Sequence, residues 1–462
     1  MMRKSRLFQV ILVFVLIAFS LVGCSGNQNP AVAQNTQLST SNPTPSASGQ
    51  TQEPAGENSP TPGTESSPTP EPLELNIKPL EIVTPNNEPI IIPEVDIDAF
   101  DVPDTEAMRF VESMKIGWNL GNTFDATSES TPLADELKIE SAWVGVLTTK
   151  EMIQAVKEAG FNTIRIPVSW HNHLLENFTI SEPWLNRVNE VVDYAISEGM
   201  YVIINIHHDI AKEYYYPTSE YLLNSKTYTT AIWTQLAKRF RDYDDHLIFE
   251  SVNEPRMVGT KYEWWLDMNN ESCRDAVECI NQLNQVFVDT VRLTGGNNAT
   301  RYLMVPGYDA SADSALSPAF KLPTDTVADR LIVSVHAYTP YNFALQGPTE
   351  NGSVSNWSMS NEASTRDIDT FMDGLYNKYI SQGIPVVIGE FGSRDKKGNL
   401  QDRVDHAAYY IRSARARGMT CVWWDNNAFS GNGENFGLLD RRNVQWKYPD
   451  LLAALMKYAE AR

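Results

Sequence analysis

The sequence predicts a (β/α)8 (TIM) barrel that extends from about residue 104 to residue 462. Eight short apolar segments rich in β-branched residues alternate with segments of helical periodicity, a pattern typical of buried parallel strands joined by helices. Several predicted helices end at a glycine just before the next apolar segment, as expected for a left-handed helix cap. These glycines are Gly160, Gly199, Gly383 and Gly418. An open, doubly wound sheet is the alternative, but no GxGxxG turn follows the first segment.

The predicted strands lie at intervals along the whole C-terminal part of the chain. They comprise residues 115–120, 163–168, 201–206, 247–252, 302–307, 331–338, 385–390 and 420–424. Helical periodicity is clear between them, for example at Leu185, Val188 and Val192, whose spacing places them on one buried helix face. The helix expected after the fifth strand is weak, because residues 308–330 contain two prolines and little periodicity.

The first 23 residues have the pattern of an export signal. Arg3, Lys4 and Arg6 precede an apolar run over residues 7–22, which is short for a membrane span. The run ends in Leu-Val-Gly-Cys, which resembles a bacterial lipoprotein box, so we expect cleavage before Cys24 and lipidation of that cysteine. We therefore expect an exported protein that is anchored at the cell surface or is extracellular. A conventional signal peptide with an incidental cysteine is the alternative.

A linker is predicted between this signal and the barrel. Residues 24–72 are rich in Pro, Ser and Thr and carry no Lys or Arg. Such a segment buries too little apolar surface to offset its ordering entropy, so we expect a disordered tether that its prolines keep extended. Apolar residues return in residues 73–103, but prolines recur, and we expect an extended segment before the domain.

Composition limits the partners of the chain. Its net charge of -21 argues against nucleic acid and anionic membrane surfaces and suits a neutral substrate. The lipid on Cys24 is the only membrane contact that we expect, and we expect a monomer. After processing, Cys273, Cys279 and Cys421 would remain, an odd number that does not predict a disulfide framework. The chain has no CxxC or HExxH motif, so we predict neither a metal nor another cofactor.

Polar and aromatic residues follow seven of the eight predicted strands, the fifth being the exception. The carboxyl ends of the strands of a parallel barrel meet at one rim, so these side chains are expected to converge there. The first three strands contribute Trp118, Asn119, Asn122, Asp125, Arg165, Trp170, His171, His173, His207, His208 and Asp209. The fourth and the last three strands contribute Asn253, Glu254, His336, Tyr338, Glu390, Trp423, Trp424 and Asp425.

Two glutamates at this rim predict the chemistry. Glu254 ends the run LIFESVNE and Glu390 lies in PVVIGEFG, and a carboxylate at the end of a buried strand is costly unless it has a use. Cleavage of a glycosidic bond needs one protonated and one ionised carboxyl group. We expect Arg165 and Tyr338 to keep Glu390 ionised and Glu254 to hold the proton. The alternative is a structural role, in which Arg165 merely neutralises Glu250.

Seven motifs that occur in one order along the chain resemble a known family. They are GWNLGNTFDA, IRIPVSW, INIHHD, FESVNEP, HAY, VIGEFG and WWDN, and together they resemble glycoside hydrolase family 5. The GWNLGNT opening and the GENFGLLDR ending are similar to its subfamily 4 of endo-β-1,4-glucanases. The resemblance covers roughly residues 104–462 and departs from the family pattern at Phe124, where leucine is usual.

The resemblance implies roles for individual residues. A retaining mechanism is implied, with Glu254 as the acid/base and Glu390 as the nucleophile. The implied −1 subsite consists of Arg165, His207, His208, Asn253, His336, Tyr338 and Trp424. Four further strand-end residues are expected to contact substrate at the rim: Trp118, Asn122, His171 and His173. Trp264 and Trp265, on the loop after the fourth strand, are expected either to bind a distal sugar or to pack that loop.

The predicted function is retaining, endo-acting hydrolysis of β-1,4-glucosidic bonds in plant β-glucans, which include cellulose, mixed-linkage glucan and xyloglucan. An endo-β-1,4-mannanase or xylanase on the same barrel is the nearest alternative. A non-catalytic, glycan-binding surface lipoprotein is an alternative of another class, and a metal-dependent hydrolase that uses His207 and Asp209 is a third. Retention requires carboxyl groups about 5 Å apart, whereas a gap beyond roughly 6.5 Å indicates inversion.

Overall fold

The structure is a computed structural model that describes residues 89–396, 398–431 and 433–460. The predicted signal peptide, the lipoprotein box with Cys24, the linker and most of residues 73–103 lie outside the described residues.

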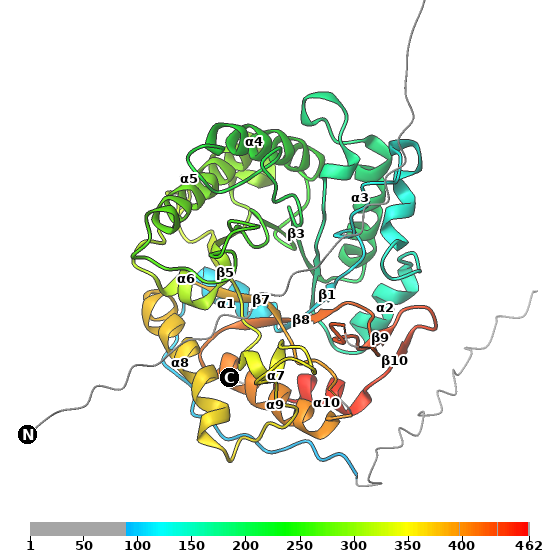
Figure 1. The fold of residues 1–462 in the computed structure, drawn as a ribbon, viewed down its shortest axis with the longest axis vertical. Helices are drawn as coiled ribbons and strands as arrows, with labels where there is room; N and C mark the ends of the chain where they lie inside the picture. Colours follow the sequence, from blue (N-terminus) through cyan, green and yellow to red (C-terminus); the bar gives the residue numbers. More distant parts are fainter. Residues whose placement is uncertain (1–88, 397, 432, 461–462) are drawn as a thin grey trace, which may run out of the picture. The chain divides into compact units, whose positions relative to one another are not determined.

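Eight parallel strands close into a barrel in the order in which they occur along the chain, so the open sheet is excluded. Figure 1 shows them as the inner ring of the domain. The strands are β1 (Ile116–Leu120), β2 (Thr163–Ile166), β3 (Tyr201–Asn205), β4 (Leu247–Glu250), β5 (Leu303–Ser311), β6 (Leu331–His336), β7 (Val386–Phe391) and β8 (Thr420–Asp425). The closing pair aligns five residues of β1 with five of β8, from Ile116 opposite Cys421 to Leu120 opposite Asp425. A small hairpin outside the barrel joins β9 (Leu439–Asp440) and β10 (Gln445–Trp446).

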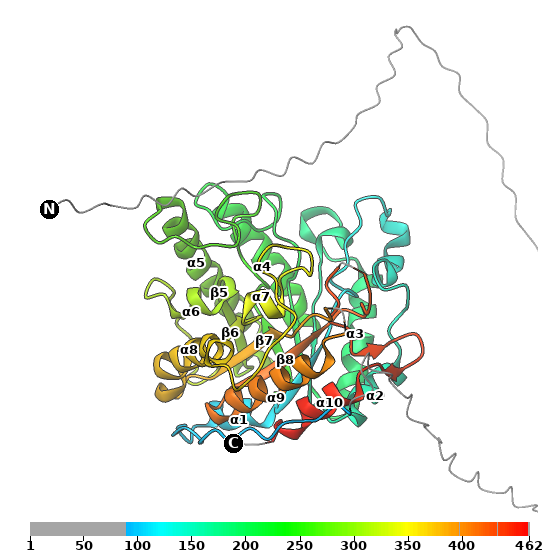
Figure 2. The same cartoon turned by 60° about the horizontal axis from the view of Figure 1, so that its bottom comes forward.

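Helices surround the barrel on its outside (Figures 1 and 2). They are α1 (Glu106–Ser113), α2 (Lys150–Glu158), α3 (Glu182–Ser197), α4 (Leu222–Arg239), α5 (Glu271–Leu293), α6 (Ala312–Leu316), α7 (Tyr341–Ala344), α8 (Glu362–Lys378), α9 (Leu400–Ala416) and α10 (Pro449–Lys457). Short 3-10 helices are η1 (Leu133–Ser141), η2 (His171–His173), η3 (Glu176–Phe178), η4 (Gly296–Ala299) and η5 (Ile380–Gln382). The weak helix predicted after the fifth strand is the five-residue α6, which ends two residues before Pro318.

The predicted left-handed glycines are present, and two of them show why glycine is needed. Gly383 has a φ of 78° after η5, and Gly418 has a φ of 83° between α9 and β8. At Gly418 a Cβ atom would also lie 2.9 Å from a methyl group of Val102. A side chain would therefore be strained there by both the backbone conformation and the close packing.

The lower interior of the barrel is apolar. Side chains of six strands pack together there, and Ala107 and Val111 of α1 join them, so α1 closes the amino-terminal end of the barrel. The strand residues of this cluster are Ile203, Ile248, Met304, Ile332, Val387 and Val422. A larger apolar layer lies between the strands and the outer helices. The buried ion pair of the interior, Arg165 with Glu250, lies above this apolar cluster, nearer the carboxyl rim.

Residues 89–103 have an extended conformation and pack on the last two long helices. The backbone N–H of Val95 donates to the Tyr458 hydroxyl at 2.8 Å, and that of Phe100 donates to the Ala416 carbonyl at 2.9 Å. The packed domain therefore begins before residue 104. Cys273, Cys279 and Cys421 are free and buried. Within the described residues, no helix has the length and apolarity that crossing a membrane requires.

Candidate active site

Arg165 is the centre of a polar layer beneath the carboxyl rim. Its side chain is fully buried in β2 and donates from Nε to Glu250 Oε2 at 2.8 Å and from Nη1 to Glu390 Oε1 at 2.7 Å. The remaining donors reach Asn119 Oδ1 at 3.0 Å and Asn253 Oδ1 at 2.7 Å. Burial alone would lower the pKa of Arg165, but the charges of the two glutamates raise it. The same guanidinium therefore neutralises Glu250 and donates to Glu390.

Glu250 supports this layer from below. It accepts a hydrogen bond from Asn205 Nδ2 at 2.9 Å and one from Ser334 Oγ at 2.5 Å, in addition to that from Arg165. Its side chain has no exposed surface. Both of its oxygens are occupied, so Glu250 holds Arg165 in place and does not meet a substrate.

Glu390 lies within β7 and is held at both carboxylate oxygens. Oε1 accepts from Arg165, and Oε2 accepts from the hydroxyl of Tyr338 at 2.9 Å. The side chain is only 6% exposed. A buried carboxylate that accepts from a guanidinium and a phenol has a single orientation, which suits a nucleophile.

Glu254 has a different environment, four residues beyond the end of β4. Its Oε1 accepts from His336 Nδ1 at 2.9 Å, its Oε2 lies 3.5 Å from Nη1 of Arg256, and its side chain is 18% exposed. Burial raises the pKa of Glu254, but the hydrogen bond from His336 and the charge of that ring lower it to about 2. Burial lowers the pKa of His336, but the charge of Glu390 and the hydrogen bond to Glu254 raise it above its ordinary value.

The structure does not support the expectation that Glu254 itself holds the proton in the free protein, because the hydrogen bond from His336 and the charge of that ring lower the pKa of Glu254. Nδ1 of His336 lies 2.9 Å from Glu254 and 3.7 Å from Glu390, and these negative charges favour the protonated form of the imidazole. His336 is thus one hydrogen bond away from the carboxyl group that needs a proton.

The two carboxyl groups face each other across a short gap. One oxygen of Glu254 and one of Glu390 lie within 4.8 Å of each other, with a nitrogen of His336 within the same distance of both. This gap agrees with a retaining mechanism, because inversion requires carboxyl groups far enough apart to place a water between the carboxylate and the sugar carbon.

A metal ion fits these groups poorly. A second set of possible ligands among the described residues consists of Asp125, His207 and His208. Asp125 already accepts the backbone N–H groups of Asn122 and Thr123, and Arg165 occupies Glu390 in the first set. The structure does not bring His207 together with Asp209, the pair expected for a metal-dependent hydrolase, since Asp209 accepts from Trp170 and His171 instead.

His207 and Trp424 lie on the floor of the rim. Their rings are parallel, with centroids 5.9 Å apart, and Nδ1 of His207 contacts Asn205 Nδ2 at 3.1 Å. Burial, with the charge of neighbouring cations, holds the pKa of His207 well below its usual range. Trp424 is the tryptophan of the WWDN motif that faces inward, whereas Trp423 packs outward and donates to the Phe436 carbonyl. His208 is more exposed and lies 3.9 Å from Asp125.

Trp118 is not a rim residue, so the expected substrate contact is wrong. Its side chain is fully buried on the outer face of β1, where Nε1 donates to Asp425 Oδ2 at 2.9 Å and Arg441 lies over the ring. Strand alternation explains this position, because Asn119, the next residue, is the one that faces inward to Arg165. Asn122 is partly buried in a left-handed conformation, with φ of 59°, on the turn after β1.

His171 lines a hollow of about 460 Å³ that also includes His208. The other lining residues are Thr127, Glu129, Ala211, Glu213 and Tyr214. Nδ1 of His171 contacts Asp209 Oδ1 at 3.0 Å; burial lowers the pKa of His171, but this contact raises it above its ordinary value. The hollow therefore continues the rim from His208 toward the loops after β1, β2 and β3.

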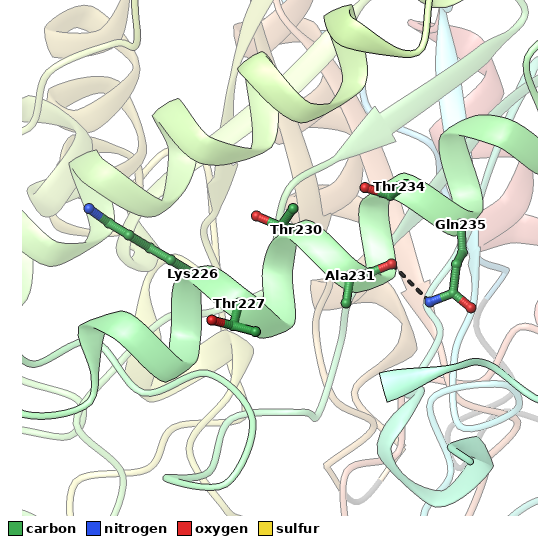
Figure 3. A pocket seen from close by; sticks show the side chains of 6 residues that line it. All are labelled: Lys226, Thr227, Thr230, Ala231, Thr234 and Gln235. Carbon is green, nitrogen blue, oxygen red and sulfur yellow. Dashed lines mark hydrogen bonds between the residues drawn. The ribbon is translucent and has the colours of Figure 1, made fainter. Parts of the chain in front are cut away.

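Another hollow, of about 570 Å³, lies on the outer surface of α4 and not at the rim. Figure 3 shows its lining residues along that one helix, with the Gln235 amide turned back to the Ala231 carbonyl. The others are Lys226, Thr227, Thr230 and Thr234. This hollow has no carboxyl or imidazole group in its lining and lacks the chemistry of the rim.

Two charged residues near Glu254, Arg256 and Asp309, were not among the predicted site residues. Arg256 lies between Glu254 and Glu263, and its guanidinium is 4.0 Å from the ring centre of Trp264, which packs on it. Asp309 lies on β5, which continues to Ser311 although the apolar pattern predicted its end at residue 307. Arg256 could have been predicted, because it directly follows the motif that contains Glu254, whereas nothing in the apolar pattern indicated Asp309. Trp265 remains 72% exposed, with its ring 6.5 Å from that of Tyr341.

Comparison with known proteins agrees with this geometry. Residues 123–430 match the family model described as cellulase (glycosyl hydrolase family 5). The chain is 45% identical over 360 residues to endoglucanase B of Ruminococcus albus, which covers 77% of this chain and 82% of that protein.

Two solved structures are also similar. One is a family 5 lichenase from Caldicellulosiruptor sp. F32 in complex with cellotetraose, at 64% identity and a TM-score of 0.79, covering 80% of this chain and 100% of the other. The other is a xyloglucan-specific endo-β-1,4-glucanase from a metagenomic library in complex with cellotriose. It is 38% identical with a TM-score of 0.68, covering 76% of this chain and 98% of the other.

Proposed function

Because the chain belongs to the cellulase family, glycosyl hydrolase family 5, we propose that Glu390 is the nucleophile and Glu254 the acid/base of an endo-β-1,4-glucanase. The observation that carries these roles is the pair of carboxyl groups within 4.8 Å of each other at the barrel rim. Only one of the two carries a cation and a phenol on its oxygens, and this difference assigns the roles.

The reaction has two steps. In the first, a Glu390 oxygen attacks the anomeric carbon while Glu254 gives a proton to the departing glycosidic oxygen, so a covalent glycosyl ester forms and the reducing-end fragment leaves. In the second, Glu254 takes a proton from water as the water attacks the same carbon, and the ester bond to Glu390 breaks. The carbon is inverted twice, so the β configuration is retained.

The neighbouring residues support each step. Arg165 and Tyr338 orient the Glu390 carboxylate, and the proton for the leaving oxygen reaches Glu254 from His336. Arg165 also holds Oδ1 of Asn253, which leaves the Asn253 amide N–H₂ to donate to a sugar hydroxyl. Trp424 and His207 offer a flat surface beneath a pyranose ring.

We propose an unbranched β-glucan with β-1,4 bonds, such as mixed-linkage glucan or cellulose chains, as the main substrate. The 64% identity to a lichenase supports this choice more strongly than the 38% identity to a xyloglucan-specific enzyme supports a branched one. Hydrolysis rates on lichenan, carboxymethylcellulose, xyloglucan, xylan and mannan test this choice. A faster rate on mannan or xylan would overturn it.

A covalent label tests the assignment of the nucleophile. A 2-deoxy-2-fluoro β-cellobioside with a dinitrophenolate leaving group forms the ester quickly and loses it slowly, because the fluorine destabilises the oxocarbenium-like transition state. We expect mass spectrometry of a digest to find the label on Glu390. Proton NMR of cellotetraose hydrolysis should show the β-anomer first; a label elsewhere, or the α-anomer first, contradicts the proposal.

We also propose that the enzyme is a monomer exported and tethered to the cell surface through a lipid on Cys24. The signal-like residues 1–23 and the Pro-rich residues 24–72 support this proposal. Metabolic labelling with palmitate should mark the full chain and not a Cys24→Ala variant, and light scattering should give the mass of one chain. Equal labelling of the wild type and of Cys24→Ala would contradict lipidation at Cys24.

A further inference from the structure

Two exposed aromatic side chains, one from the loop after β4 and one from α7, which follows β6, lie side by side. Trp265 is 72% exposed, more than any other tryptophan that the structure describes, and Tyr341 is 49% exposed. Their ring centroids are 6.5 Å apart and the ring planes meet at 73°, so the two rings form a corner. Single exposed apolar side chains are ordinary, but neighbouring rings from two different segments are typical of a binding surface. We call Trp265 and Tyr341 the aromatic pair.

The loop that carries Trp265 is held by contacts within the domain. Nε of Arg256 lies 3.5 Å from Oε1 of Glu263, two residues before Trp265. The hydroxyl of Tyr308, in β5, donates to the Tyr262 carbonyl at 2.6 Å. These contacts fix the backbone just before Trp265, so its ring is held at the surface.

The segment of α7 is fixed in a similar way. Nζ of Lys396, a buried residue, donates to the Asn342 carbonyl at 2.7 Å, and the Val354 N–H donates to the same oxygen at 3.0 Å. The backbone N–H of Arg394 donates to the Ala344 carbonyl at 3.0 Å. Both rings of the aromatic pair are therefore part of segments that are ordered without a ligand, which reduces the entropy lost on binding.

The aromatic pair lies on the Glu254 side of the site. Oε2 of Glu254 is 3.5 Å from Nη1 of Arg256, whose guanidinium is 4.0 Å from the ring centre of Trp264, the residue before the tryptophan of the pair. The tyrosine of the pair follows Tyr338, the donor to Glu390, by three residues. The floor of the rim comes instead from β8 and the residues after β3. The pair therefore extends the site beyond Glu254.

A β-glucosyl ring suits this corner. Its hydroxyl groups are equatorial, so both of its faces consist of C–H groups, which are attracted to the negative face of an aromatic ring. The acid/base gives its proton to the oxygen of the leaving fragment, so the leaving sugar lies beside Glu254. A sugar farther along the same fragment comes next to the aromatic pair.

We propose that the aromatic pair binds a glucosyl residue of the leaving, reducing-end part of the chain, beyond the sugar next to Glu254. The inference rests on the acid/base role proposed for Glu254. Trp264 does not share this role, because its ring packs on Arg256. Of the two roles expected for these tryptophans, loop packing therefore belongs to Trp264 and sugar binding to Trp265.

The test locates the bond that is cut in cellopentaose. Heavy oxygen at the reducing end of this substrate labels one product of each cut, and mass spectrometry identifies it. Loss of a leaving-side contact weakens the binding modes that have a long leaving fragment. With Trp265→Ala and with Tyr341→Ala, we therefore expect the product ratio to move toward cleavage near the reducing end by about 2- to 10-fold. Trp265→Phe, which keeps an aromatic face, should keep most of the wild-type ratio.

Two controls separate sugar binding from general damage. Trp143 is an exposed tryptophan of another loop, with its ring 5.8 Å from that of His208, and Trp143→Ala should not move cleavage toward the reducing end. The second control is 2,4-dinitrophenyl β-cellobioside, which has no sugar beyond the bond that is cut. On this substrate, kcat/KM of Trp265→Ala should fall much less than on cellohexaose.

Four results would overturn the inference. They are a wild-type product ratio in either alanine variant, movement toward the non-reducing end, the same movement in Trp143→Ala, and an equal loss of kcat/KM on both substrates, which indicates loop packing. The fluoro-sugar label keeps this failure separate from that of the proposed function. A label on Glu254 contradicts the proposed function, whereas a label on Glu390 with an unchanged product ratio contradicts only the role of the aromatic pair.

Discussion

The two carboxyl groups of the site are held in opposite ways. Glu390 lies inside a strand, is 6% exposed, and accepts one hydrogen bond on each oxygen from Arg165 and Tyr338. Glu254 lies on a loop beyond its strand, is 18% exposed, and meets groups that gain or lose protons. The nucleophile needs one charge state and one orientation, whereas the acid/base must change its charge twice in each cycle. The fold therefore fixes the orientation of Glu390 and places Glu254 beside His336, a group that can exchange a proton with it.

The largest effect is expected when the carboxylate of Glu390 is removed. Glu390→Gln should lower kcat on cellotetraose by about 10⁴-fold or more, because covalent attack is lost while binding remains. Calorimetry should still detect cellotetraose binding. The exposed Glu362 at the start of α8 offers a matched control, since Glu362→Gln should keep wild-type turnover. Turnover of Glu390→Gln within tenfold of the wild type would contradict the assignment.

Removal of the Glu254 carboxyl group should have a smaller effect that depends on the leaving group. Glu254→Ala should lose about 10²- to 10⁴-fold on cellotetraose but far less in the first step on a dinitrophenyl cellobioside. Azide should accelerate the second step and give a β-glycosyl azide, since azide needs no general base. The assignment fails if azide instead restores the activity of Glu254→Ala and gives an α-glycosyl azide. Such a product forms when azide attacks the substrate directly, in place of a missing nucleophile.

Loss of a single donor separates the two environments further. Tyr338→Phe removes one hydrogen bond from the Glu390 carboxylate, which is worth about 1.5–3 kcal/mol and predicts a roughly 10- to 100-fold lower kcat. Arg256→Lys keeps the charge near Glu254 at a contact of 3.5 Å and should cost less than tenfold in kcat. Steady-state kinetics on cellotetraose measure both. If Arg256→Lys lowers kcat more than Tyr338→Phe does, the surroundings of Glu254 are the more strictly required of the two, contrary to this prediction.

The smallest effect is a pH dependence of stability that only the Glu254 side should show. The pKa of His336 is raised above 6.5, so its stabilisation is present below pH 6.5 and disappears as the pH rises through the folded value. The pKa of Glu254 is lowered from 4.5 to about 2, so its stabilisation is present above pH 4.5 and disappears as the pH falls toward 2. The pair therefore contributes most between pH 4.5 and 6.5.

Thermal unfolding across this range measures that contribution. The difference in Tm between the wild type and His336→Gln should be greatest at about pH 5.5 and should shrink by about 1–3 °C toward pH 3 and pH 9. Tyr338→Phe serves as the comparison, because its phenol stays protonated throughout this range. A difference for His336→Gln that does not change with pH would show that the pair shares no proton.

Local patterns were sufficient to predict much of the molecule. The eight strands, the helix caps and the weak sixth helix follow from apolar spacing, glycine and proline, which act through near neighbours. Glu254, Glu390 and Arg165 were also found, because polar residues at the ends of apolar strands stand out. Trp118 was misplaced, since the apolar pattern does not distinguish the inner from the outer face of a strand that is buried on both sides.

The sequence by itself determined the closed order of strands, the family and the two glutamates, because each depends on residue type and order along the chain. Only the tertiary structure decided that His336 contacts Glu254 and that Asp309 lies beside the segment that carries Glu254. Both depend on contacts between residues that are far apart in sequence, which the closure of the barrel brings within a few ångströms of one another. Glu254 and His336 are 82 residues apart and 2.9 Å from each other.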